Sequence, residues 1–136
     1  VAGAAGRAVA GDTGASVAAT ASVAGHIAPP WSGFRGGKGV ATSAGACLAV
    51  FPAYFPVDAV VAVTAAATSQ RAERSIQLSC TAWVIATLAW WRWKLPNAWG
   101  PRPGPALTGF AAVSSAMILA KFRAARRGAA TAARPA

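Results

Sequence analysis

Glycines and a lysine occur together at one point of the chain, where they could bind a phosphate group. The run Gly36-Gly37-Lys38-Gly39 stands immediately before an apolar stretch that is compatible with a helix. Glycines leave backbone N–H groups unshielded, a helix N-terminus adds positive potential, and lysine adds a full charge. The nucleotide-binding pattern GxxxxGK[ST] is not met, because Ser32 stands where its first glycine belongs and Gly39 follows the lysine. The loop therefore predicts a phosphate site of another kind.

Composition and the distribution of charge indicate a membrane protein. The chain carries 13 Lys and Arg against three acids, a net charge of +10, yet only 12% of its residues are charged and 55% are apolar. A soluble domain carries about 25% charged residues. The stretches without charge are 13–34, 39–57, 59–70, 75–91 and 103–120. A nucleic-acid-binding protein would show a basic face along one element, so no nucleic-acid partner is expected.

The uncharged stretches predict the helices that must position the loop. We expect helices over about 15–27, 39–51, 57–70, 75–91 and 106–120, and the end of a further apolar segment over 1–10, followed by a turn at 11–14. Pro29 and Pro30 end the first helix, because proline cannot donate a backbone hydrogen bond. Read as one helix, residues 39–70 would be roughly 48 Å long, against a hydrocarbon core of roughly 30 Å. We therefore expect a helical hairpin that turns at Pro52 and Pro56.

The predicted fold class is all-α: a multispanning helical membrane protein with short helices and a proline-containing hairpin. Residues 1–127 are expected to form one helical membrane domain, because the length leaves no room for a second core. Residues 128–136 are a basic, Ala-rich tail that is expected to be disordered. The tryptophans that follow residue 89 are interpreted as a membrane-interface belt, and the small residues Gly109, Ala112 and Ala116 as a helix-packing face.

Positive charges orient the predicted helices across the membrane. Nine Lys and Arg fall on the side of the 31–38 loop, the 71–74 link and the C-terminus, and four fall on the other side. Short loops on the cytoplasmic side carry the excess of positive charge. We therefore expect the glycine loop to lie in the cytoplasm.

The residues around the glycine loop form a longer and more specific pattern. The chain reads GHIAP at 25–29 and FRGGKGVAT at 34–42. This resembles the central motif, roughly GHxxPxxxxFxGGKGVAT, of the bacterial membrane glycerol-3-phosphate acyltransferases that use acyl phosphate, the PlsY family. Every fixed position of that motif is present here.

The resemblance implies a multi-pass enzyme of the bacterial inner membrane, with its active-site loops in the cytoplasm. Such an enzyme moves a fatty acyl group from acyl phosphate to the 1-hydroxyl of glycerol-3-phosphate, giving lysophosphatidic acid and phosphate in phospholipid synthesis. Its partners would be these two substrates and the lipid bilayer. No metal and no cofactor are implied.

The resemblance also assigns roles to individual residues. Lys38 and His26 are the candidate catalytic residues. His26 is either a general base or a structural residue that orients the loop; we favour the orienting role, because a phosphate oxygen is available to take the proton. The residues implied to bind substrate phosphate are Arg35, Gly36, Gly37, Lys38, Gly39, Thr42 and Arg123.

Two other motifs of the family differ in this chain. The N-terminal motif GSxNxGxTN is not present, so the N-terminal helices of the family are expected to lie upstream of Val1 or to be lost. The C-terminal motif, roughly HRxNIxRL, matches only at Arg123. Phe122 and Ala125 stand where the family has histidine and asparagine.

An alternative function is a non-catalytic or diverged membrane protein whose basic loops bind anionic lipid or a partner. An upstream copy of the N-terminal motif would favour the enzyme over this alternative. Cys47 and Cys80 lie in apolar stretches without metal-ligand spacing, so we interpret them as buried apolar side chains and expect no metal site and no disulfide.

Overall fold

The computed structural model describes residues 1–68 and 72–132. Across those residues the chain is all-helical, as predicted, and contains no strand. The helices are α1 (Ala2–Ile27), the short 3-10 helix η1 (Pro30–Ser32), α2 (Val40–Val50), α3 (Phe55–Thr68), α4 (Ala72–Arg92) and α5 (Pro105–Ala132).

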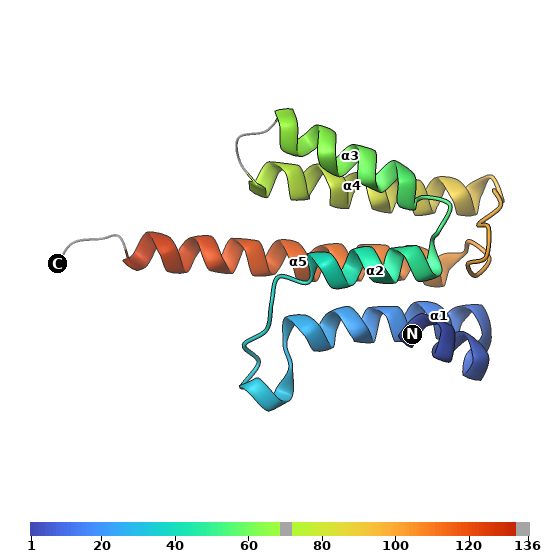
Figure 1. The fold of residues 1–136 in the computed structure, drawn as a ribbon, viewed down its shortest axis with the longest axis horizontal. Helices are drawn as coiled ribbons and strands as arrows, with labels where there is room; N and C mark the ends of the chain where they lie inside the picture. The colour runs from blue at the N-terminus through green and yellow to red at the C-terminus, as the bar shows by residue number, and fades with distance from the viewer. Residues whose placement is uncertain (69–71, 133–136) are drawn as a thin grey trace.

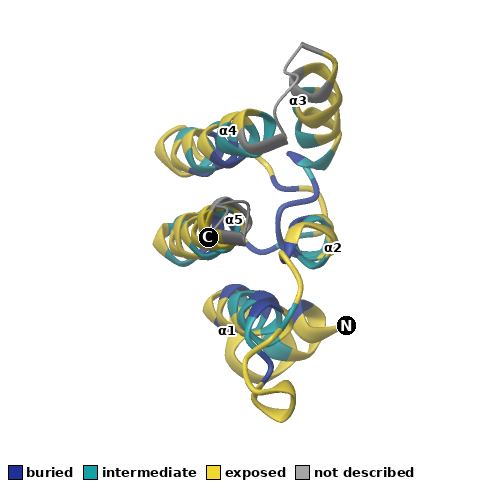
Figure 2. Ribbon diagram, turned by 90° about the vertical axis from the view of Figure 1, so that its left-hand side faces the viewer, coloured by how far each residue is buried: buried dark blue, intermediate teal, exposed yellow. Residues whose placement is uncertain are grey.

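The long helices lie side by side, with α5 between α1 and α4 (Figure 1). α2 packs on α1, and α3 packs on α4. Figure 2 shows that buried residues line the inward faces of these helices, whereas their outward faces are exposed. The bundle therefore has one shared interior, to which α5 contributes along much of its length.

α2 and α3 form the helical hairpin that the prolines predicted. α2 ends at Val50, α3 begins at Phe55, and the two helices run in opposite directions (Figure 1). Pro52 lies in the link between them and Pro56 in the first turn of α3, where a missing N–H costs little. The glycine loop before α2 and the start of α4 consequently lie at the same end of the bundle.

Aromatic side chains fasten the opposite end of the bundle. The ring of Phe51 stacks on Tyr54 at 5.3 Å between centroids and meets Trp90 edge to face at 5.5 Å. Asn97 Nδ2 donates to the carbonyl oxygen of Val50 at 2.9 Å, so the end of α2 is tied to the loop between α4 and α5. Edge-to-face and offset aromatic pairs add to the stabilisation that burial of the rings provides.

The first helix differs from the sequence expectation. Residues 2–10 form a helical segment, and the backbone leaves helical geometry at Ala10 and Gly11, where Gly11 has φ +62°. The reversal thus comes earlier than the predicted turn at 11–14. It folds the first segment back along α1, where Gly6 and Gly14 approach so closely that a Cβ on either would meet the carbonyl oxygen of the other.

α5 is longer than the span that the sequence predicted. It runs from Pro105 to Ala132, so residues 121–132, including the first five residues of the tail that was expected to be disordered, are helical. Residues 133–136 lie outside the described residues, as do residues 69–71, where the helix predicted over 57–70 meets the predicted 71–74 link. α4 begins at Ala72, three residues before the predicted start of that span.

The small residues of α5 do not form the packing face that we predicted. Gly109, Ala112 and Ala116 are all exposed, whereas the buried face of the same helix carries larger side chains, among them Leu107 and Phe110. Positions 109, 112 and 116 share one side of a helix with 3.6 residues per turn. In this chain that side points away from the bundle.

One helix among the described residues is long and apolar enough to cross a membrane: α5, over Pro105–Gly128. Val40–Val50 and Phe55–Thr64 are apolar but shorter. A helix of 11 residues, the length of α2, extends roughly 17 Å and does not by itself span a hydrocarbon core of roughly 30 Å.

The close approach inside α1 predicts opposite effects for two Gly→Ala substitutions. Gly14→Ala should lower the free energy of unfolding by about 1–3 kcal/mol, because its Cβ would collide with the carbonyl of Gly6. Gly109→Ala should raise it by about 0.5–1 kcal/mol, because a Cβ there meets no atom within 4 Å and alanine favours the helix. Thermal unfolding of the purified protein in detergent, followed by circular dichroism, measures both. Stabilisation by Gly14→Ala would contradict the folded-back arrangement.

Candidate phosphate-binding site

The glycine loop is built by a change of direction after α1. Pro29 and Pro30 follow the end of α1, η1 makes one tight turn, and Gly33 and Phe34 adopt left-handed backbone geometry, with φ +60° and +62°. The N–H of Phe34 donates to the carbonyl of Pro29 at 3.0 Å, which closes this turn. The chain then runs back past the end of α1 and enters α2 at Val40.

The loop lies directly against the last turn of α1. The N–H of Gly37 donates to the carbonyl of His26 at 3.2 Å. A Cβ on Gly36 would collide with the carbonyl oxygens of His26 and Ile27, and a Cβ on Gly37 would lie 2.5 Å from His26 Nε2. At Gly36, where the neighbouring atoms are backbone, only glycine permits this approach. From the sequence, we predicted that these glycines expose backbone N–H groups to a phosphate. The structure shows that they also leave space for the end of α1.

Gly39 is the N-cap residue of α2, and both its backbone conformation and its surroundings favour glycine. It has φ +80°, and a Cβ there would also press against the side chain of Ile27. The N–H groups of Gly36 and Gly39 have no partner in the described part of the chain, whereas that of Gly37 is already donated to His26. Two of the three predicted glycine donors are thus available to an anion in this conformation.

His26 and the glycine loop are brought together, as the motif predicted. The imidazole is exposed in the last turn of α1 and packs against Gly37, and its ring nitrogens make no hydrogen bond within the described residues. This position fits a histidine that shapes the loop by contact.

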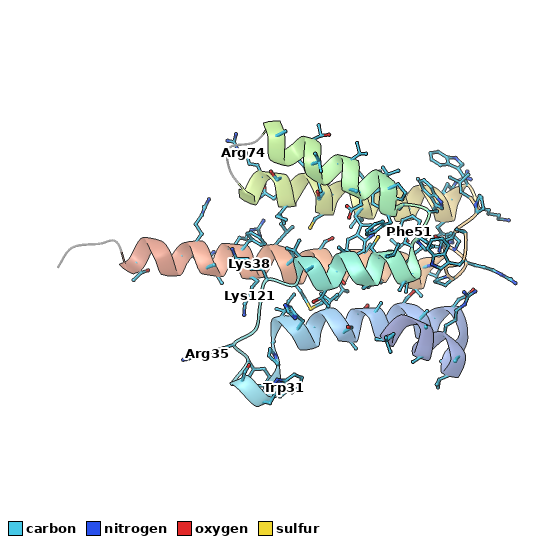
Figure 3. The ribbon with its side chains drawn as sticks, viewed as in Figure 1. Trp31, Arg35, Lys38, Phe51, Arg74 and Lys121 are labelled. Carbon is cyan, nitrogen blue, oxygen red and sulfur yellow. The ribbon has the colours of Figure 1, made fainter. Side chains whose placement is uncertain are left out.

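α5 supplies two contacts that the sequence analysis did not identify. Lys121 Nζ donates to the carbonyl of Ile27 at 3.1 Å, where its charge faces the negative end of α1. Lys38 Nζ lies over the ring of Phe122, 4.7 Å from its centroid. Figure 3 shows Lys38 and Lys121 at the same end of the bundle. The only signal for this pairing was the resemblance itself, which placed Phe122 in the third motif.

The other predicted phosphate ligands are more dispersed. Arg35 is exposed and extends away from Lys38 and Lys121 (Figure 3). Thr42 is half-buried in the first turn of α2. Arg123 is exposed on α5 and makes no hydrogen bond or ion pair with the loop in the described part of the chain. The structure thus gathers His26, the glycines and Lys38, and leaves the two arginines outside that group.

The charge of Lys38 is not neutralised by a carboxylate. The one ion pair among the described residues joins Arg7 Nε and Asp12 Oδ1 at 3.2 Å, and it lies at the opposite end of the bundle. Lys38 instead contacts an aromatic face, an interaction worth about 0.5–1 kcal/mol at an exposed site. A phosphate group can displace so weak a partner.

An apolar cavity of about 250 Å³ lies beside the first turn of α2. Its walls come from α2, α3 and α4, with Ile118 of α5, and apolar side chains provide most of the lining. Asp58 contributes a carboxylate, and Val40 and Ser43 form the side nearest the glycine loop. No signal in the sequence indicated this cavity, because its walls depend on how side chains from four helices pack together.

Comparison with known proteins identifies the family. A profile of the family described as "Glycerol-3-phosphate acyltransferase" matches residues 1–130. The chain belongs to this family. The resemblance that the central motif indicated is thereby confirmed, and with it the assignment to a family of acyltransferases.

Curated relatives carry the same name. A glycerol-3-phosphate acyltransferase of Bacillus cytotoxicus is 43% identical over 68 residues, which cover 50% of this chain and 34% of the relative. One of Cereibacter sphaeroides is 54% identical over 44 residues, covering 32% of this chain and 22% of the relative. The matched part thus spans about a third or less of the length of these relatives. No solved structure matches the chain.

The contact between α5 and α1 predicts a specific loss of stability. Lys121→Met should lower the free energy of unfolding by about 1–2 kcal/mol, because it removes a charged donor from the last turn of α1. Arg127→Met, an exposed position on the same helix, is the matched control and should change it by less than about 0.5 kcal/mol. Equal effects of the two substitutions in a detergent unfolding titration would argue against the Lys121 contact.

Proposed function

We propose that this protein transfers a fatty acyl group from acyl phosphate to the 1-hydroxyl of glycerol-3-phosphate, giving lysophosphatidic acid and phosphate. The observation that carries the proposal is the glycine loop of an acyltransferase family, held against the end of α1, with Lys38 free of any carboxylate partner in the described residues. The names of the relatives supply the acceptor, glycerol-3-phosphate. The acyl phosphate donor is inferred from the motif.

Lys38 is the central residue of the proposed reaction. The hydroxyl oxygen of the acceptor attacks the acyl carbon, an ester bond forms, and the bond between that carbon and the phosphate oxygen breaks. Negative charge increases on the departing phosphate, where the Lys38 ammonium and the N–H groups of Gly36 and Gly39 offset it. The hydroxyl proton passes to a phosphate oxygen, so His26 acts by shaping the loop.

In this proposal the remaining predicted ligands bind the phosphate of the acceptor, glycerol-3-phosphate. Arg35 and Arg123 are exposed, and Thr42 offers a hydroxyl from α2. Long arginine side chains can swing toward a bound anion and grip it through two parallel hydrogen bonds. The acceptor would thus be held beside the donor, which places the reacting atoms in line.

The apolar cavity beside Val40 suits the acyl chain of the donor. It starts one turn from the glycine loop and continues between α2, α3 and α4. A donor whose phosphate lies at Lys38 can direct its chain into this space, where apolar side chains form most of the lining. A phosphate site at the glycine loop and an apolar cavity beside it therefore suit the two parts of an acyl phosphate.

We place the protein in the inner membrane of a bacterium as a multi-pass helical bundle. Large apolar side chains on the outward faces of all five α-helices support this placement; examples are Val17, Leu48, Val60, Ile85 and Val113. The glycine loop, the start of α4 and the C-terminal part of α5 share one end of the bundle. That end carries most of the positive charge, so we assign it to the cytoplasm.

One observation favours a second candidate, a diverged membrane protein that binds anionic lipid without catalysis. Phe122 and Ala125 replace the polar residues of the third motif, and Phe122 covers the Lys38 ammonium. A loop that only binds lipid phosphate needs the lysine and the glycines but not those polar groups. The activity measurement below separates the two candidates.

The proposed topology predicts which engineered cysteines are labelled from each side. Ser32→Cys and Arg74→Cys should react only with reagent on the cytoplasmic side, and Ala98→Cys only from outside, because the two loop groups lie at opposite ends of the bundle. Cys47 and Cys80 are buried, so the unmodified protein is the control and should not react. Labelling of Ser32→Cys and Arg74→Cys from opposite faces would overturn the topology.

The proposed chemistry predicts a large effect at Lys38. Lys38→Ala should slow the release of phosphate from acyl phosphate by one to two orders of magnitude, because a charge-assisted contact is worth about 1.5–3 kcal/mol. Lys38→Arg should recover only part of the rate, since a planar guanidinium does not replace a compact ammonium. The measurement is inorganic phosphate and lysophosphatidic acid formed by purified protein in detergent.

Arg127→Ala is the matched control for this experiment. It removes a cation from the same end of the bundle, outside the candidate site, and should leave the rate unchanged. A Lys38→Ala rate equal to that of the unmodified protein would show that the glycine loop is not the reaction site. If the unmodified protein forms neither product, the non-catalytic candidate is preferred.

A further inference from the structure

The end of the bundle opposite the glycine loop contains a second cavity, of about 520 Å³. It is formed by the loop between α4 and α5, from Trp91 to Pro103. Two cationic side chains, Lys94 and Arg102, and the amide of Asn97 are part of its lining. This cavity takes no part in the reaction proposed above, because the length of the bundle separates it from Lys38 (Figures 1 and 3).

The loop that forms this cavity is held by its own hydrogen bonds. The backbone carbonyl of Trp90 accepts from the N–H of Leu95 at 3.0 Å, and the indole N–H of Trp90 donates to the carbonyl of Pro96 at 3.1 Å. Asn97 Nδ2 donates to the carbonyls of Val50 and Pro101, at 2.9 and 2.6 Å. The backbone is therefore organised before any ligand arrives, which lowers the entropy that binding would cost.

The same network holds two residues in left-handed geometry. Lys94 has φ +52° and Ala98 has φ +48°, values that side chains other than glycine adopt at some cost. Lys94 is also one of the two cationic residues that line the cavity. The loop thus presents the charge of Lys94 from a constrained backbone.

The two cations of the cavity have no carboxylate partner in the part of the chain that the structure describes. Asp12 is the acid that contacts this loop, and its Oδ1 already pairs with Arg7. Its Oδ2 accepts from the backbone N–H of Arg102 at 3.1 Å, which positions the loop but leaves the guanidinium unpaired. A cavity lined by two unpaired cations favours an anion.

Tryptophans at the same end indicate where that anion comes from. Trp91, Trp93 and Trp99 are 44%, 67% and 66% exposed around the loop. Exposed indoles favour the headgroup level of a bilayer, where the available anions are the phosphates of phospholipids. Trp91 also lines the cavity itself, so the aromatic group and the cationic group meet there.

We propose that the loop between α4 and α5 is a binding site for the phosphate group of an anionic phospholipid, with Lys94 and Arg102 as the charged ligands. The site lies in the leaflet opposite the glycine loop and fastens that end of the bundle to the membrane. The inference rests on the membrane placement proposed above and is independent of acyl transfer.

Native mass spectrometry of the purified protein in a neutral detergent tests this site. The probes are phosphatidylglycerol, phosphatidylcholine and soluble glycerol phosphate, each titrated separately, the last in the Lys38→Ala background. Lys94→Gln and Arg102→Gln should each weaken retention of phosphatidylglycerol about fivefold. Arg92→Gln, the matched control, removes a cation from the same end but not from the cavity lining, and should change retention less than twofold.

The outcomes distinguish a lipid ligand from a soluble phosphate ligand, and two of them would contradict the proposal. Preference for phosphatidylglycerol over both other probes supports a lipid ligand; equally tight, Lys94-dependent binding of glycerol phosphate supports the same phosphate site with a soluble ligand. Equal losses for Arg92→Gln and Lys94→Gln, or equal retention of phosphatidylcholine, would overturn the site. Phosphate release measured on the same variants reports separately on acyl transfer, so failure of one proposal is distinguishable from failure of the other.

Discussion

The close approach of the glycine loop to the end of α1 is the contact on which the candidate site depends. Gly36 lies so near the carbonyl oxygens of His26 and Ile27 that a side chain there would separate the loop from the helix, and Gly37 lies against the imidazole of His26. The chain can turn back this tightly because prolines end α1 and left-handed residues reverse its direction. The position of Lys38 follows from this contact, since the lysine comes directly after the second glycine.

α5 reinforces that contact from outside the motif. Lys121 binds the carbonyl at the end of α1, and Phe122, the next residue, lies under Lys38. One turn of α5 therefore contacts both the end of α1 and Lys38, and its position depends on the packing of α5 between α1 and α4. Changes in the interior of the bundle can reach the site by this route, because packed helices transmit displacement with little deformation.

The bundle separates two kinds of surroundings that the proposed reaction needs. Charged and polar groups collect at the glycine loop, whereas the neighbouring cavity is almost entirely apolar. An acyl phosphate has the same division between a doubly ionisable head and a hydrocarbon chain. The opposite end of the bundle repeats the combination of cations with apolar surface in a different form, with tryptophans in place of a cavity for a chain.

The sequence by itself determined the all-helical class, the proline-bounded hairpin and the glycine-lysine motif of the family, because each depends on residues that are near one another in the chain. Proline removes a backbone donor wherever it stands, and a glycine run before a helix keeps its character in any fold. Only the tertiary structure decided that Lys121 meets the end of α1 and Phe122 meets Lys38, that residues 2–10 fold back on α1, and that Gly109 faces outward. These depend on which faces of distant helices bury the most apolar surface together, a sum over the whole bundle that no local pattern contains.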